Sequence, residues 1–229
     1  PSNITVNTST GLCNAIVNYQ SPIGLDNCPS AITNQTLGII SGGIFPIGVT
    51  TNTFVVTDNS GASASCSFTV TVVDSQPPTI TCPSNITVNT ASGLCNAIVN
   101  YNTPVGIDNC SGAVTTQIAG LASGSSFPVG ITTNTFVVTS SNGQTASCTF
   151  TINVIDNQPP SISCPANITV NTDFNKCSAV VNYLTPVGMD NCSNITTIRT
   201  SGLASGSTFP TGITTNTFVV TDNNGRTSS

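Results

Sequence analysis

The chain has 229 residues, a formal net charge of −5 and only 5% charged residues. It contains no histidine, tryptophan or glutamate, so most side chains that serve general acid–base catalysis are missing, and we expect no enzyme. Its three cations, Lys176, Arg199 and Arg226, are too few for the basic patch that binds nucleic acid or an anionic membrane. No apolar run approaches the ~20 residues of a membrane-spanning helix, so we expect no membrane insertion.

The predicted elements are all β-strands, because apolar residues recur with a period of two and never with helical spacing. In chain order, the clearest copy alternates at Ile86–Val88, at Ala97–Tyr101, around Phe136 and over Cys148–Val154. Turn dipeptides separate these runs: Ser92-Gly93, Ser111-Gly112, Ser123-Gly124 and Asn142-Gly143. Short strands at this spacing predict an immunoglobulin-like β-sandwich without the tryptophan of antibody domains.

The sequence repeats every 82 residues, as the positions of Cys13, Cys95 and Cys177 show. No insertion or deletion interrupts the copies. We therefore predict a linear array of three tandem modules: residues 1–75, 76–157 and 158–229. The first lacks a counterpart of Cys82 and the third lacks a closing strand, which predicts a segment of a longer, processed protein.

Several motifs recur in the same order within each copy. A proline followed by (S/A)NITV comes first, then Asp-Asn-Cys, then Phe-Pro-x-Gly-x-Thr, and the linkers contain Gln-Pro-Pro. This arrangement closely resembles the hyalin repeat, or HYR, module over essentially the whole chain. The resemblance implies an immunoglobulin-like fold in extracellular proteins, with an adhesive or scaffolding role and no catalysis.

Ten cysteines indicate an oxidising compartment, since neither CxxC nor Cys/His spacing suggests a zinc site. Four cysteines in one module allow three pairings. The first and last strands of such a sandwich are neighbours, which favours Cys82–Cys148 and leaves Cys95 to pair with Cys110. The corresponding bonds in the other modules would be Cys13–Cys28 and Cys177–Cys192.

A Cys66–Cys82 bond is excluded because the closing strand separates Cys66 from the linker by far more than disulfide reach. Cys66 and Cys164 are expected to pair outside this sequence.

The aspartates have two possible roles. Asp74 and Asp156 lie in the linkers, and Asp108 lies in an Asp-Asn-Cys motif. Ca²⁺ prefers six to eight oxygen ligands, and one linker offers a single aspartate, so Ca²⁺ is possible here but poorly supported. We favour Asx turns, in which the side chain caps nearby backbone N–H groups, and expect the same for Asp58 and Asp222.

Glycosylation is a further expectation, because so few charges leave the surface dependent on neutral groups for solvation. The motif Asn-x-Ser/Thr occurs repeatedly. Candidate acceptors are Asn3, Asn85, Asn167, Asn34 and Asn194, with Asn7, Asn109 and Asn191 as further matches. The alternative is that Asn-Ile-Thr-Val is simply the sequence of a half-buried strand.

Two functions fit these observations. The first is a structural segment of an extracellular filament or cell-surface stalk, in which uniform repeats act as a rigid spacer and Pro-Pro linkers stiffen the connections. The alternative is an adhesion module that binds glycan or protein through its loops. Under either function, the expected partners of the chain are further copies of the same repeat in a longer chain or fibre, together with covalent glycans. Nearly identical loops in successive copies favour the spacer.

Overall fold

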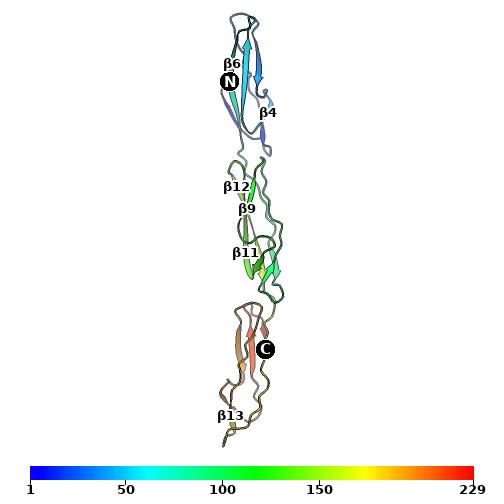
Figure 1. Ribbon diagram of the computed structural model, residues 1–229, viewed down its shortest axis with the longest axis vertical. Coiled ribbons are helices and arrows are strands. Elements are labelled where there is room, and N and C mark those ends of the chain that lie inside the picture. The colour runs from blue at the N-terminus through cyan, green and yellow to red at the C-terminus, as the bar shows by residue number, and fades with distance from the viewer. The chain divides into compact units, whose positions relative to one another are not determined.

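The computed structural model describes residues 1–229, and every regular element in it is a β-strand (Figure 1). The predicted all-β class is therefore confirmed. No helix with the length and apolar character needed to cross a membrane is present. The residues form two compact units: Pro1–Pro83, Thr103–Ala119 and Thr135–Thr149 in the first, and Ser84–Asn102, Gly120–Asn134 and Phe150–Ser229 in the second. The second repeat thus contributes to both units.

The first repeat contains six strands: β1 (Ile4–Asn7), β2 (Asn14–Val17), β3 (Ile32–Leu37), β4 (Gly43–Pro46), β5 (Gly48–Thr57) and β6 (Ser63–Val73). They form one sheet in the order β1-β6-β5-β3 and a second sheet of β2 and β4. The opening and closing strands are neighbours, because β1 pairs in parallel with β6 and places Ile4 opposite Val70. This adjacency is the one on which the Cys82–Cys148 prediction depended.

The core of this repeat follows from the period of two. Along β6, Phe68, Val70 and Val72 are buried while the threonines between them are half-buried. The buried cluster comprises Ala15, Val17, Phe45, Phe54, Phe68, Val70 and Val72. Burying each of the larger side chains contributes about 1.5–3 kcal/mol.

A tyrosine joins the core to a loop in every repeat. The ring of Tyr19 packs edge-on against Phe68, with centroids 5.0 Å apart, and its hydroxyl donates to the Ile39 carbonyl at 2.6 Å. Tyr101 and Tyr183 make the equivalent bonds to Leu121 and Leu203 at 2.7 and 2.6 Å. The half-buried phenol thus keeps a hydrogen bond while its ring packs on the core.

The second repeat contains β7 (Ile86–Asn89), β8 (Asn96–Ile98), β9 (Val114–Ala119), β10 (Ser126–Pro128), β11 (Gly130–Thr139) and β12 (Thr145–Ile155). Its sheets, β7-β12-β11-β9 and β10-β8, have the same order as those of the first repeat. The parallel register also recurs, since Ile86 lies opposite Ile152. An 82-residue sequence repeat therefore produces a repeat of topology.

The third repeat contains β13 (Ser178–Val181), β14 (Thr196–Ser201), β15 (Ser207–Pro210), β16 (Thr217–Thr221) and β17 (Thr227–Ser228). Its sheets are β13-β15 and β14-β16-β17. Residues 168–171, the counterpart of β1, form no strand here, and the first three of them line a groove of about 710 Å³. Phe209 is only half-buried beside this groove, whereas Phe45 and Phe127 are fully buried.

A buried amide shapes the connection between β3 and β4. Asn52 is fully buried, and its Oδ1 accepts hydrogen bonds from the Ile39 N–H at 2.8 Å and from Gln35 Nε2 at 3.1 Å. Gly38 must be glycine here, because its φ is +95° and an added Cβ would lie 2.1 Å from Asn52 Oδ1. The chain therefore bends around the asparagine side chain.

Replacement of Asn52 by alanine should open this bend, because the buried Ile39 N–H loses its acceptor at a cost of about 1–3 kcal/mol. We expect amide hydrogen exchange at Ile39 to become roughly tenfold faster or more. Asn34→Ala, at an exposed position on β3, is the matched control and should leave Ile39 unchanged. Equal protection in both variants would show that the bend does not depend on Asn52.

Candidate functional site

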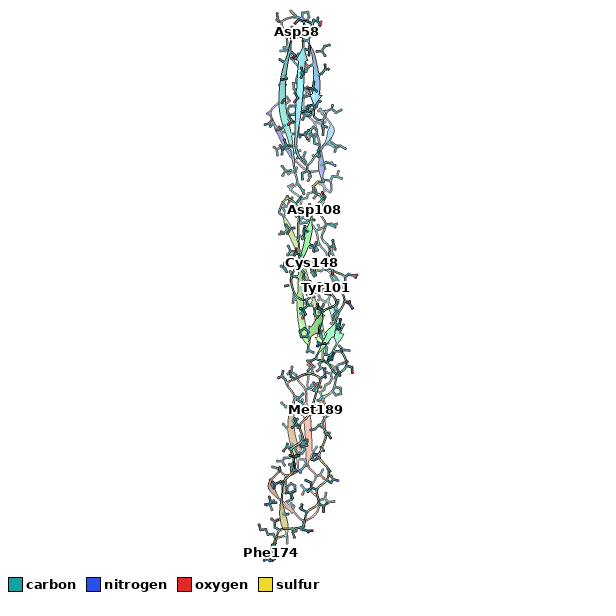
Figure 2. All side chains as sticks on the ribbon, viewed as in Figure 1. Asp58, Tyr101, Asp108, Cys148, Phe174 and Met189 are labelled. Atoms are coloured by element: carbon teal, nitrogen blue, oxygen red, sulfur yellow. A yellow bond between two sulfur atoms is a disulfide. The ribbon has the colours of Figure 1, made fainter.

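Successive repeats meet at two joints built from the same residue types, and each joint lies inside one compact unit. Joint 1 comprises Cys13, Asp74–Gln76, Asp108–Cys110 and Ser140–Gln144. Joint 2 comprises the residues 82 positions later: Cys95, Asp156–Gln158, Asp190–Cys192 and Asp222–Arg226. Figure 2 labels Asp108 in joint 1.

A disulfide crosses each joint. Cys13 is bonded to Cys110 and Cys95 to Cys192, each over a sequence separation of 97. The predicted bonds Cys13–Cys28, Cys95–Cys110 and Cys177–Cys192 are therefore wrong. The reason is positional: Cys95 follows a loop held by the linker to the next repeat, whereas Cys110 belongs to the loop that contacts the preceding repeat. Cys28 and Cys177 are unpaired and exposed.

The other predicted bond, Cys82–Cys148, is confirmed. It connects the residues before β7 to β12, two strands that are neighbours in the sheet. Cys66 and Cys164 have no partner in the chain, and no Cys66–Cys82 bond forms. That Cys66 and Cys164 pair outside this sequence stays a prediction.

An asparagine side chain bridges the two repeats beside each joint disulfide. Asn109 Nδ2 donates to the Leu12 carbonyl at 3.0 Å and to Asp74 Oδ1 at 3.2 Å. Asn191 makes the same two contacts in joint 2, to Leu94 at 2.9 Å and Asp156 at 3.1 Å. One amide group therefore binds both the loop and the linker of the preceding repeat.

A hairpin turn adds a second set of contacts to the linker. In joint 1, Asn142 Nδ2 donates to the Asp74 carbonyl at 3.1 Å, and Gln144 Nε2 donates to the Ser75 carbonyl at 3.3 Å. In joint 2, Asn224 Nδ2 donates to the Asp156 carbonyl at 2.9 Å. Arg226, at the position of Gln144, donates to the same carbonyl. The second joint thus replaces an amide by a charged donor, which makes the stronger type of hydrogen bond.

The linker itself is fixed to the repeat that precedes it. Asp74 is 5% exposed, and its Oδ1 accepts from Thr8 Oγ1 at 3.3 Å and from the Gln76 N–H at 3.1 Å. Gln76 in turn accepts from the Gly11 N–H at 2.8 Å and donates to Thr8 Oγ1 and the Ser9 carbonyl at 3.0 Å each. The same contacts recur around Asp156 and Gln158. The linker is therefore a hydrogen-bonded part of the fold.

The Asx-turn role predicted for the aspartates is confirmed. Asp74 Oδ1 caps the N–H two residues later, and Asp108 Oδ2 does the same for Cys110 at 3.4 Å. The equivalent bonds at Asp26, Asp156, Asp190 and Asp222 are also present. No group of three or more His, Cys, Asp or Glu gathers anywhere in the chain. The atoms Asp74 Oδ2, Asp108 Oδ1 and Asn109 Oδ1 are buried without a hydrogen-bond partner.

Hydrogen bonds within the hairpin turn of the first repeat stabilise its conformation. In the first repeat Asp58, labelled in Figure 2, accepts from the N–H groups of Ser60 and Ala62 at 2.9 and 2.8 Å. Donation from the Ser60 hydroxyl lowers the pKa of the Asp58 carboxyl below its ordinary value, and backbone N–H groups add to this. The carboxylate therefore favours the turn above its unfolded pKa, and this contribution disappears as the pH falls through the folded pKa.

The glycosylation motifs fall into two classes, those whose asparagine lies inside a joint and those whose asparagine is exposed. Asn109 and Asn191 use their Nδ2 atoms inside the joints, so neither nitrogen is available for a sugar in the folded chain. The remaining candidates are exposed: Asn3, Asn7, Asn34, Asn85, Asn167 and Asn194. Glycosylation at these positions stays a prediction.

Asn109→Ala should loosen joint 1, because Leu12 and Asp74 lose a shared donor at a cost of about 1–2 kcal/mol. We expect dithiothreitol to reduce Cys13–Cys110 about 5–30-fold faster in this variant, as measured by alkylation and mass spectrometry. The control is Asn27→Ala, the equivalent substitution at an exposed position of the first repeat. The proposed role of Asn109 fails if both variants are reduced at the same rate.

We expect EDTA to change the melting temperature little, because hydrogen bonds and disulfides hold each joint. An ion contributing about 2 kcal/mol would shift the melting of a domain this size by roughly 10 °C. Calorimetry with and without EDTA, and with Ca²⁺ restored, measures the effect. A reversible fall of that size would assign Ca²⁺ to the buried oxygens of Asp74, Asp108 and Asn109.

The sequence of this chain is similar to those of known proteins. The HYR domain matches residues 1–72, 73–154 and 155–229. Hyalin of Strongylocentrotus purpuratus is 34% identical over 232 residues, which cover 98% of this chain and 19% of that protein. Hyalin of Lytechinus variegatus is 33% identical over 98% of this chain and 43% of its own length. The serine-rich adhesin for platelets of Staphylococcus aureus is 31% identical over 89% of this chain and 9% of its own length.

Among solved structures, Drosophila N-cadherin EC1-3 aligns over the whole chain and 95% of its own length, with a TM-score of 0.41 and 11% identity. The chain spans less than half of each protein named above by sequence. The matched family and the relatives named above are not catalytic families, and one of these relatives is named an adhesin. Three domain matches in tandem account for residues 1 to 229, and the chain belongs to the HYR domain family.

Proposed function

We propose that this chain is a segment of an extracellular, adhesion-related protein in which its repeats act as a stiff, disulfide-stapled spacer. The observation that carries the proposal is the joint: a disulfide and several side-chain hydrogen bonds connect each pair of successive repeats. Three disulfides support an oxidising, extracellular setting. The relatives named hyalin and adhesin support a role in adhesion.

Stiffness follows from how little of the linker is free. Asp74 and Gln76 are bonded to the first repeat, and Pro77-Pro78 restricts the backbone that follows. Thr79 then exchanges two backbone hydrogen bonds of 2.8 Å with Ile107 of the second repeat. Only a few residues separate the end of one set of bonds from the start of the next, which leaves few soft dihedral angles.

Uncharged amide groups donate the side-chain hydrogen bonds that cross joint 1. Asn109, Asn142 and Gln144 donate from uncharged amides in joint 1. Such bonds are not weakened by the ionic screening that affects surface ion pairs. A spacer built in this way should keep its stiffness across a wide range of ionic strength.

Loop-mediated adhesion is the alternative function. The segments after Asp-Asn-Cys differ most between repeats, as Pro29–Leu37 and Ser193–Thr200 show. Arg199 lies in the second of these segments and is exposed, and arginine is common in binding sites. Its guanidinium, however, donates to the Gly202 carbonyl of its own repeat. Binding that is lost on Arg199→Ala, with the joints unchanged, would favour this alternative.

Distance measurements across joint 1 test the spacer. Spin labels on unnatural amino acids at Asn34 and Val114, both exposed, report on the two sides of the joint. The four unpaired cysteines are replaced by serine. We expect one narrow distance distribution, and a broad one after Cys13→Ser with Cys110→Ser, because the joint loses its covalent connection.

The matched control is Cys82→Ser with Cys148→Ser, which removes a bond within one repeat and should leave the distribution narrow. A broad distribution in the fully disulfide-bonded protein would contradict a stiff spacer. So would a width that does not change when Cys13–Cys110 is removed.

A further inference from the structure

We propose that, between Cys13 and Cys192, the joint disulfides carry tension past most of the sandwich strands, so that in this part of the chain pulling loads only a short stretch of the second repeat. This inference deepens the proposed spacer role and rests on it for its biological setting. The path of the force depends only on which cysteines are bonded.

The two joint disulfides overlap along the sequence. Cys13 is bonded to Cys110 and Cys95 to Cys192, and Cys95 precedes Cys110, so the two closed loops share residues 95–110. A chain pulled from both ends becomes taut through Cys13 to Cys110, then backwards along the shared residues to Cys95, and on to Cys192. Between positions 13 and 192, only residues 95–110 of the backbone are in this path.

Most of the sandwich lies outside the path. The long strands β5, β6, β11 and β12 belong to the closed loops and carry no force once the path is taut. Between positions 13 and 192, the single strand inside the path is β8, which pairs with β10 over three residues. Cys82–Cys148 is also outside the path, since neither of its cysteines lies between Cys95 and Cys110.

The loaded stretch has little slack. Residues 96–108 contain no helix or turn, and no residue between 95 and 110 has a positive φ. The stretch therefore contains no helical or left-handed segment that force would have to unwind. At ~3.5 Å per residue it can reach only ~50 Å, compared with ~290 Å for an unbonded repeat of the same 82-residue length.

The folded repeat also holds this stretch along its length. Ala97 and Val99 are buried in the core, and Tyr101 bonds to the Leu121 carbonyl. Gly106 donates to Thr115 Oγ1 at 2.8 Å, and Ile107 pairs with Thr79. Small forces are resisted by this packing, and larger forces by covalent bonds.

The bonds expected from sequence would not have this effect. Together with Cys82–Cys148, the expected bonds Cys13–Cys28, Cys95–Cys110 and Cys177–Cys192 would bypass most of the second repeat. They would leave residues 28–82 and 148–177 under load, and these residues include the long strands β5 and β6. The pattern of joint disulfides therefore decides whether residues 28–82 and 148–177 unfold when the chain is pulled.

Single-molecule force spectroscopy on the whole chain tests the path, with handles at the two termini and serine in place of the four unpaired cysteines. The taut path then consists of residues 1–13, 95–110 and 192–229, about 220 Å at ~3.5 Å per residue. We expect the disulfide-bonded chain to stop extending near that length. After reduction it should reach about 800 Å.

Two double variants separate the bonds. Cys13→Ser with Cys110→Ser forces the path through residues 1–95 and should lengthen it about twofold, to ~460 Å. Cys82→Ser with Cys148→Ser is the control and should leave ~220 Å unchanged. Final extension depends on covalent connectivity, so a variant that folds poorly still reports its path.

Extension of the bonded chain well beyond ~220 Å would overturn the proposal, as would no gain on removing Cys13–Cys110 or a gain in the control. The spin-label distances report on the spacer role separately. A narrow spin-label distribution together with an extension well beyond ~220 Å would reject the tension path and support the spacer. A broad distribution together with an extension near ~220 Å would support the tension path and contradict the stiff spacer.

Discussion

The disulfide across each joint is the constraint on which the arrangement of the repeats depends. A bond between Cys13 and Cys110 requires the loop before β2 to meet the Asp-Asn-Cys loop of the next repeat. Once they meet, Asp74 is buried between them, and burying a carboxylate is costly unless donors surround it. Thr8, Gln76 and Asn109 supply those donors. All three donors bond to Asp74 Oδ1, so one carboxylate oxygen connects the linker both to the first repeat and to the Asp-Asn-Cys loop of the second.

Much of the fold could be predicted from sequence, because the period of two and the 82-residue repeat are strong local patterns. The bond Cys82–Cys148 was also predictable, since it needs only the adjacency of opening and closing strands. The joint bonds were not predicted because Cys95 and Cys110 are only 15 residues apart in the sequence, which favoured a bond between them. A strand advances about 3.3 Å per residue, so two cysteines close in sequence can be far apart in space. Strand residues follow Cys95 in β8 just as they follow Cys66 in β6, and in neither case does the chain turn back to bring the next cysteine within disulfide reach.

The sequence did contain one unused signal for the joints. Every Asp-Asn-Cys motif pairs an amide with a cysteine, and turn chemistry requires only the aspartate, whose carboxylate caps the cysteine N–H. The asparagine instead serves the preceding repeat: Asn109 Nδ2 donates to the Leu12 carbonyl and to Asp74 Oδ1 there, and within its own repeat it contacts only the sulfur of Cys110 at 3.5 Å. A polar residue that a turn does not need, repeated beside a cysteine, indicates contact with another module.

The hairpin turns show which parts of the joint can vary. In the first repeat Asp58 accepts the turn N–H groups, whereas in the second Asn142 Oδ1 accepts from Ser140 Oγ and the Gln144 N–H. The turn therefore needs one acceptor, at either position. Asn142 can serve both purposes because an amide also has a donor, which it directs to the Asp74 carbonyl. An aspartate at that position could form the turn but not the joint, so the demand for an amide comes from the neighbouring repeat.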